Sequence, residues 1–180
     1  MKAQAVLALD LATVTGWALV WAPASGVPRV SWGTWDLSAP DRVKKEMVVP
    51  GYAFATLERH LGVLWERTGP WQSVYWEKPI APARIAHGGH VFGAFMGTLV
   101  TFCWRHHVFQ EPIYTTTVKK HWTGSGRAGK TDMIDQAKAR GFGVKNDNEA
   151  DALALLDVIL CRDFQTNISA FEKDTKGRNV

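Results

Sequence analysis

The feature that most constrains the fold is an apolar run near the start of the chain that ends in an acid. Residues 3–9 become continuously apolar and lead directly to Asp10. A run of this kind is typical of a central strand that is buried on both faces of a sheet. Residues 15–21 and 30–36 are two further strand candidates, separated by a turn that contains two prolines and a glycine. We therefore expect these three strands to form an antiparallel meander.

The rest of the chain alternates between helical and strand patterns. We expect a surface loop over 37–50, a mobile segment over 80–90, helices over 52–67, 91–107, 131–140 and 147–160, and strands over 73–77 and 108–114. Thr131 can cap the third of these helices, and Asp147 or Asn148 can cap the last. Three antiparallel strands followed by βα units predict an α/β protein with a ribonuclease H-like mixed five-stranded sheet flanked by helices. We expect one domain over residues 1–166 and a polar, frayed tail over 167–180.

Composition limits the classes of function. The chain has 180 residues, of which 46% are hydrophobic, so it can build a sizeable core, and a disordered or disulfide-stapled protein is excluded. Cys103 and Cys161 lie in apolar stretches, and we expect both to be buried thiols in a reducing compartment. The absence of a signal-peptide pattern and of a membrane-spanning apolar run predicts a cytoplasmic protein with no membrane partner. The net charge of +4 is compatible with a polyanionic partner.

Three acids stand at the ends of predicted elements. Asp10 ends the first strand, Glu77 ends the fourth, and Asp151 lies in the first turn of the last helix. If the two strands are parallel neighbours, their carboxylates meet at one edge of the sheet, where such sheets bind ligands. Asp147 and Asn148 lie on the same helical face as Asp151. Oxygen ligands of this kind suit Mg²⁺, for which Mn²⁺ can substitute. Taken singly, each acid is also explained as a turn former, a surface ion pair or a helix cap.

A basic, glycine-rich segment precedes the last two helices. Lys119, Lys120, His121, Arg127 and Lys130 fall within it, and we expect a DNA-binding loop in which glycines let the backbone approach phosphates and the basic side chains neutralise them; Arg84 adds to the same face. Residues 124–131 also match the phosphate-loop pattern of nucleotide hydrolases. That pattern requires a buried strand immediately upstream, whereas a basic segment precedes it here, so the match is the less favoured interpretation.

Four motifs together resemble the RuvC-type Holliday junction resolvases. They are Leu9-Asp10 with the following turn to Trp17, Val74-Tyr-Trp-Glu77-Lys-Pro79, the segment from Thr117 to Lys130, and Asn148-Glu-Ala-Asp151 with the helix that follows. The motifs occur in the family's order and span residues 5 to 160. Phage-encoded members are the expected neighbours of so divergent a sequence.

The resemblance implies roles for individual residues. Asp10, Glu77 and Asp151 would hold the metal ions, and Lys119 and Lys130 would contact the cleaved phosphate as catalytic residues. Asn148 stands where relatives usually place an acid or a histidine, and Asp147 or Glu149 can take its place. Ile80 stands where bacterial members tend to carry an aromatic residue that stacks on unpaired bases.

The resemblance predicts a Mg²⁺-dependent endonuclease that resolves four-way junctions, and other branched DNA, by symmetrical paired nicks. Two metal ions can activate water and stabilise the leaving 3′-oxygen, which gives 5′-phosphate and 3′-hydroxyl ends. Paired nicks need two active sites and therefore predict a homodimer, with the helix over 91–107 as a candidate for part of its interface. Two other hypotheses remain open at this point: a non-catalytic branched-DNA-binding protein and a phosphate-loop NTPase that uses residues 124–131.

Overall fold

A mixed six-stranded sheet with helices on both faces forms the body of the molecule. The computed structural model describes residues 5–24, 26–40, 49–78 and 88–174. The elements are β1 (Ala5–Asp10), β2 (Val14–Trp21), β3 (Arg29–Asp36), α2 (Val49–Thr68), β4 (Trp71–Lys78), α3 (Gly88–Arg105), β5 (Phe109–Tyr114), α4 (Thr115–Thr123), α5 (Lys130–Ala139), α6 (Asp147–Phe164), the 3₁₀ helix η1 (Ile168–Ala170) and β6 (Glu172–Lys173). The predicted α/β class with a ribonuclease H-like mixed sheet is confirmed, with a short sixth strand added. None of the helices in these ranges is long and apolar enough to cross a membrane.

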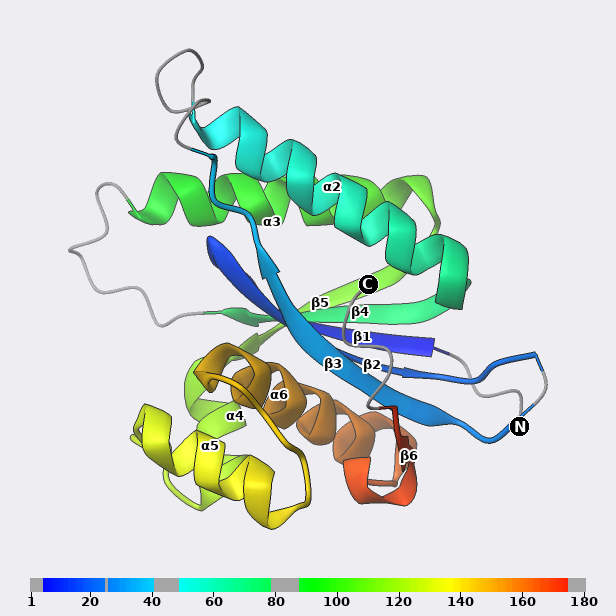
Figure 1. The fold of residues 1–180 in the computed structure, drawn as a ribbon, viewed down its shortest axis with the longest axis vertical. Coiled ribbons are helices and arrows are strands. Elements are labelled where there is room, and N and C mark those ends of the chain that lie inside the picture. Colours follow the sequence, from blue (N-terminus) through cyan, green and yellow to red (C-terminus); the bar gives the residue numbers. More distant parts are fainter. Residues whose placement is uncertain (1–4, 25, 41–48, 79–87, 175–180) are drawn as a thin grey trace.

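The strand order places β1 in the middle of the sheet. The order is β5-β4-β1-β2-β3-β6, with β2 antiparallel to both of its neighbours, β1 and β3, and with β4 and β5 parallel to β1. The expected meander and the expected parallel neighbours β1 and β4 are both present. As Figure 1 shows, α2 and α3 cover one face of the sheet, and α4, α5 and α6 cover the other.

Side chains of the central strands alternate between two separate cores. Leu7 and Leu9 of β1 face a core with α2 and α3, whereas Val6 and Ala8 face a core with α4, α5 and α6. This is the alternation that a central strand produces, because successive side chains point to opposite faces of the sheet. Asp10 follows Ala8 by two residues, so its carboxylate lies on the α6 face.

Helix α4 is not among the elements expected from the sequence. The segment from Thr117 to Lys130 was predicted to be a basic loop, yet its first part is helical to Thr123, where Gly124 ends the helix in a left-handed conformation. Val118 and Trp122, one helical turn apart, are both buried, and the indole of Trp122 donates to the Met133 carbonyl at 3.1 Å. Packing of these two side chains outweighs the low helix propensity of the threonines that begin the segment.

Three smaller expectations also differ from the structure. Residues 168–174 are not frayed: Ile168 is fully buried, and β6 pairs with β3 in parallel. Cys103 is buried as expected, but Cys161 is exposed. Gly129 and Asn146 cap α5 and α6 in place of the residues predicted for those positions. Most of the expected loop over 37–50 and of the segment over 80–90 lies outside the described residues.

Candidate active site

The register of two parallel strands brings the first two acids together. Leu9 of β1 is paired with Trp76 of β4, so Asp10 and Glu77 occupy neighbouring positions where these strands end. Tyr75 of β4 belongs to the same core as Ala8 of β1, and Glu77 follows Tyr75 by two residues. Both carboxylates therefore lie on the α6 face of the sheet, at its carboxyl edge.

The third acid comes from the first turns of α6, and the start of that helix is tightly fixed. The Asn146 side chain accepts a hydrogen bond from the Glu149 amide at 3.0 Å, and the buried Glu149 carboxylate accepts one from the Lys145 amide at 2.8 Å. These reciprocal bonds satisfy amides that the first helical turn leaves free. They commit Glu149 to capping, whereas Asp151, two residues further on, lies close enough to Asp10 and Glu77 for its charge to raise the pKa of both.

Gly16 lets α6 approach the sheet closely, and the sequence analysis did not identify it. It is the cross-strand partner of Asp10, and a Cβ atom at this position would lie 2.0 Å from the backbone oxygen of Asn148. A glycine inside a strand pattern often marks a close approach of another backbone. That signal was available in the sequence, but it does not say which segment approaches.

The three carboxylates repel one another in a poorly hydrated site. Burial raises the pKa of Asp10 to about 7, and the charges of Asp151 and Asp147 add to the increase. Burial, together with Asp10 and Asp151, raises the pKa of Glu77 to about 8. Burial also raises the pKa of Asp151 to about 6. Carboxyl groups that share a site shift in this way because each negative charge disfavours the next.

Two carboxylate oxygens in this site have no hydrogen-bond partner among the described residues. They are Oε1 of Glu77 and Oδ1 of Asp151, and both are buried. The other oxygen of Glu77 accepts a hydrogen bond of 3.4 Å from the hydroxyl of Thr115, which begins α4 and was not identified from the sequence. Buried oxygens without partners are costly unless a cation binds them. The donor set, oxygen only and rich in carboxylates, fits Mg²⁺ or Mn²⁺.

Lys119 and Lys130 lie near the acids but in different settings. The positive charge of Lys119 lowers the pKa of Glu77, Asp10 and Asp151, and its ammonium donates to the Ala128 carbonyl at 2.9 Å. Lys130 is exposed and forms an ion pair of 2.5 Å with Asp147, which lowers the pKa of that carboxyl. The predicted ligand Asp147 is therefore engaged by a lysine, although its charge still acts on Asp10.

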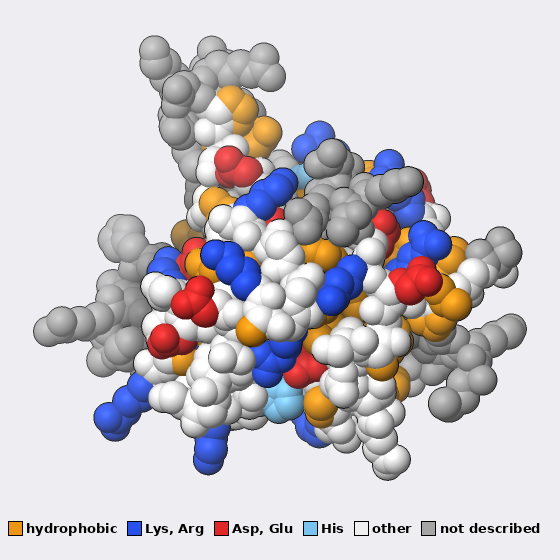
Figure 2. All heavy atoms as spheres, turned by 60° about the horizontal axis from the view of Figure 1, so that its bottom comes forward, with side chains coloured by type: hydrophobic (Ala, Val, Ile, Leu, Met, Phe, Trp, Pro, Cys, Tyr) orange, Lys and Arg blue, Asp and Glu red, His pale blue; other side chains and the backbone are white. Residues whose placement is uncertain are grey.

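The remaining predicted residues are dispersed. Lys120 and Arg127 are exposed, as a DNA contact requires. His121 instead bonds the buried carboxylate of Asp157 at 2.8 Å. Asn148 is half-buried in the first turn of α6, and Arg84 lies outside the described residues. Figure 2 turns the side of the molecule with α4, α5 and α6 toward the viewer. Lys and Arg side chains are spread between Asp and Glu side chains there and do not gather in one patch.

The phosphate-loop match has the wrong surroundings. The strand that such a loop must follow is replaced by α4, so residues 124–131 connect two helices. Residues 153–157, which mimic a second nucleotide-binding strand, lie within α6. The NTPase hypothesis therefore lacks its structural requirement.

Comparisons with known proteins identify the fold. No protein-family model and no curated protein sequence matches the chain. Among solved structures, Thermus thermophilus RuvC is similar with a TM-score of 0.62 at 17% identity, over 91% of this chain and 99% of that one. The same organism's RuvC in complex with a Holliday junction substrate gives 0.59 at 19% identity, over 84% and 90%. The yeast mitochondrial Holliday junction resolvase Ydc2 gives 0.52 at 15% identity, over 86% and 76%. The chain thus has the fold of the RuvC-type resolvases, as its four motifs predicted.

Proposed function

We propose that this chain, which has the fold of the RuvC-type resolvases, is a metal-dependent endonuclease that cuts branched DNA, four-way junctions above all. The observation that carries the proposal is the group of Asp10, Glu77 and Asp151. They are raised in pKa by burial, and two of them hold buried oxygens without a partner among the described residues. A site of this kind is poised for divalent cations. The solved neighbours that share the fold are Holliday junction resolvases.

The three acids would hold Mg²⁺, with Asp147 and Asn148 beside them at the start of α6. When bound at such carboxylates, divalent ions supply a nucleophile at neutral pH and stabilise charge on the attacked phosphate and the leaving 3′-oxygen. The carboxylates would hold the cations at the edge of the sheet, facing the phosphate, and the register of β1 with β4 keeps Asp10 and Glu77 side by side. The products would be 5′-phosphate and 3′-hydroxyl ends.

Two lysines would bring positive charge to the phosphodiester. Lys119 lies close enough to influence all three acids, and its tie to Ala128 holds the turn before α5. Lys130 at the start of α5 would exchange its bond to Asp147 for a DNA phosphate. Lys120 and Arg127, both exposed, would contribute phosphate contacts that position the DNA without reading its sequence.

Symmetrical nicks in a four-way junction would require two copies of this site, and therefore a homodimer. Helix α3 is the candidate for part of the interface. It exposes Met96 at 37% and Trp104 at 78%, which are large apolar side chains on the outside of the molecule. Exposed apolar surface of this kind is common at sites of protein association.

Cleavage of an end-labelled four-way junction, beside a linear duplex of matched sequence, tests the proposal. We expect paired nicks on the junction that require Mg²⁺ or Mn²⁺ and disappear in EDTA. Asp10→Asn should abolish cleavage while junction binding persists. Asp135→Asn, the same change at an exposed position of α5, is the matched control and should cut normally.

Two outcomes would contradict the proposal in different ways. Tight junction binding by the unmodified protein, without any cleavage in Mg²⁺ or Mn²⁺, would refute the nuclease activity and favour a structure-specific binding protein. Equal cutting of junction and duplex would keep the nuclease but remove the preference for branched DNA.

A further inference from the structure

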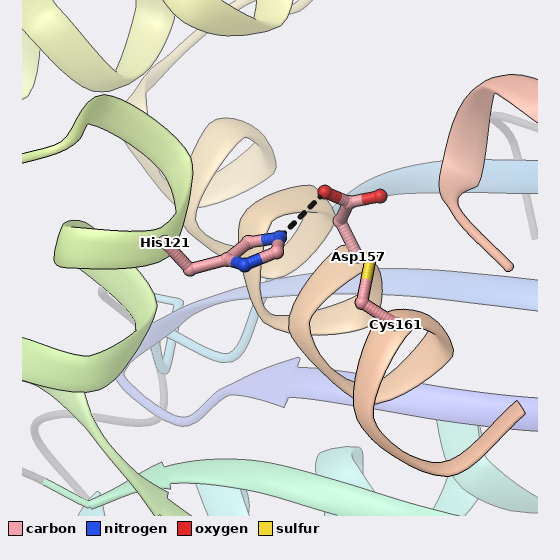
Figure 3. Close-up of side chains that lie close together, drawn as sticks. All are labelled: His121, Asp157 and Cys161. Atoms are coloured by element: carbon pink, nitrogen blue, oxygen red, sulfur yellow. Dashed lines mark hydrogen bonds and ion pairs between the residues drawn. The ribbon is translucent and has the colours of Figure 1, made fainter. Parts of the chain in front are cut away.

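A second group of metal-binding side chains lies outside the acidic site. His121 of α4 and Asp157 and Cys161 of α6 place a nitrogen, an oxygen and a sulfur within 4.8 Å of one another. Asp157 and Cys161 are four residues apart, so they occupy one face of the helix. Figure 3 shows the imidazole reaching across from α4 to the Asp157 carboxylate, with the Cys161 sulfur directed toward the same carboxylate.

This group is separated from the acidic site along α6. Asp157 follows Asp151 by six residues, which corresponds to about 9 Å along a helix. Asp157 is 5% exposed, and its two oxygens accept from His121 and from the Ile168 amide, each at 2.8 Å. A buried carboxylate held in this way is a fixed anchor, whereas His121 and Cys161 are exposed and can adjust.

The donor types select a different class of ion from the one at the acids. Imidazole, carboxylate and thiolate together suit Zn²⁺ and its neighbours in the first transition row, whereas Mg²⁺ prefers oxygen alone. Tetrahedral ligands of Zn²⁺ stand about 3.4 Å apart at bond lengths of about 2.0–2.3 Å. The three donor atoms now lie within 4.8 Å of one another, so binding requires the side chains to close around the ion.

Space for a fourth ligand is present beside the group. A pocket of about 380 Å³ is lined by His121 and Asp157 together with Arg140, Asn167 and Ser169. A water molecule from this pocket can complete a tetrahedron. The guanidinium of Arg140 stacks on Trp122 at 3.9 Å and donates to the Trp122 carbonyl, so other contacts hold this positive charge in place.

We propose that His121, Asp157 and Cys161 bind one transition-metal ion, preferably Zn²⁺, which links α4 to α6. On binding, the S–H bond of Cys161 breaks and a sulfur–metal bond forms, and the proton leaves to solvent. The ion also replaces the hydrogen bond between His121 and Asp157, and the proton of that bond moves to the other nitrogen of the neutral imidazole. The linked helices carry Lys119 and Asp151, so the ion would hold the lysine in place relative to the acid. The site does not depend on the proposed nuclease function.

Cobalt is the probe that reports the thiolate directly. Reduced, metal-free full-length protein is titrated with CoCl₂ in excess Mg²⁺, which occupies the acidic site. We expect a thiolate-to-cobalt charge-transfer absorption that saturates at one equivalent and is displaced by ZnCl₂. Cys161→Ser should abolish the absorption. His121→Ala should weaken affinity more than about 100-fold, since loss of even an outer-shell partner costs about 10–100-fold.

Two controls separate this site from the rest of the protein. Cys103→Ala removes the other cysteine, which is buried in the opposite core, and should leave the titration unchanged. Asp10→Asn should also leave it unchanged, which distinguishes this site from the acids. No charge-transfer absorption in the unmodified protein, or one that survives Cys161→Ser, would overturn the proposal. In that case the His121–Asp157 pair would serve only to bond α4 to α6.

Discussion

The two faces of the sheet are built from the same strands but differ in chemistry. The face under α2 and α3 is packed with large apolar side chains, including stacked Trp17 and Trp35 at 5.7 Å. The face under α6 carries the buried charged side chains of the described residues, which are Glu77, Glu149 and Asp157. The core under α2 and α3 therefore only stabilises the fold. The core under α6 also stabilises it, but it contains buried carboxylates that lower the stability.

The carboxylates of the α6 face differ in whether the fold supplies their hydrogen-bond partners. Glu149 and Asp157 accept hydrogen bonds from backbone amides and so stabilise the fold. Glu77 and Asp151 keep buried oxygens that no described residue satisfies, and burial, together with the charges of its neighbours, raises the pKa of Asp10. Groups left unsatisfied at this cost are typical of functional sites. The comparison predicts that the two faces respond in opposite ways to substitution.

The largest effect is expected for Asp10→Asn on the α6 face. Junction cleavage should fall at least about 1,000-fold, because a metal ligand contributes several kcal/mol to the transition state. The melting temperature of the metal-free protein at pH 8 should rise, since the substitution removes a buried negative charge from a repulsive group. Parallel cleavage assays and thermal melts check both. A loss of stability in EDTA would show that Asp10 is a structural group.

Leu57→Ala on α2 should give the opposite pair of results. Leu57 is fully buried, and truncation of such a side chain costs about 2–5 kcal/mol. We expect Tm to fall by roughly 5–15 °C while cleavage well below Tm is retained. Leu153→Ala is the matched change on α6, equally buried and two residues from Asp151. It should lower both stability and cleavage, and equal behaviour of the two variants would remove the distinction between the faces.

Sequence patterns predicted the parts of the fold that depend on local chemistry. The apolar run ending at Asp10 identified a central strand, and parallel pairing with the strand of Glu77 was the condition under which the two carboxylates were expected to meet. The sequence patterns did not predict helix α4, because Val118 and Trp122 acquire their helical register from contacts with α5 and α6. A single pair one turn apart among threonines and lysines carries too little periodic signal.

The candidate site was predictable to the level of residue type and element end. The sequence did not indicate which acid of α6 keeps an oxygen without a partner, since Glu149 and Asp151 are separated by only two residues. Their difference depends on the cap at Asn146, which directs Glu149 to the Lys145 amide. The group of His121, Asp157 and Cys161 was also missed, because one of its members comes from the unexpected helix α4.

Gly16→Ala tests how closely α6 must approach the acidic edge. The added methyl group would lie 2.0 Å from the Asn148 backbone oxygen, so the first turn of α6 must shift. A displacement of about 1 Å at a reacting centre can cost about 100-fold, and we expect cleavage to fall about 10- to 100-fold. Gly62→Ala on α2, where the space is open, is the control. Unchanged cleavage by Gly16→Ala would mean that Asp151 tolerates movement.

The last expected effect is the pH dependence of metal-free stability, which should arise mainly from the α6 face. Unfolded carboxyl groups titrate near pH 4, whereas Asp10 and Glu77 titrate near 7 and 8 in the folded protein. The folded state therefore holds more protons, and stability falls as pH rises through these values. Between pH 6.5 and 8 the loss should be about 2–2.5 kcal/mol, or about 4–10 °C in Tm.

Shifted groups of the opposite face change this dependence little. Burial lowers the pKa of His60, which adds a small rise in stability with pH that ends just above the ordinary imidazole value, and burial raises the pKa of Cys103 to about 12, so its thiol stays protonated in the folded protein. Mg²⁺ should cancel the loss at pH 8, because the cation neutralises the carboxylates that repel one another. Thermal melts at pH 6.5 and pH 8, with EDTA or with Mg²⁺, test this prediction. In EDTA, the Tm of Asp10→Asn should fall less between the two pH values than that of the unmodified protein does. A stability that rises between pH 6.5 and 8 without metal would contradict the assignment of the buried charges to this face.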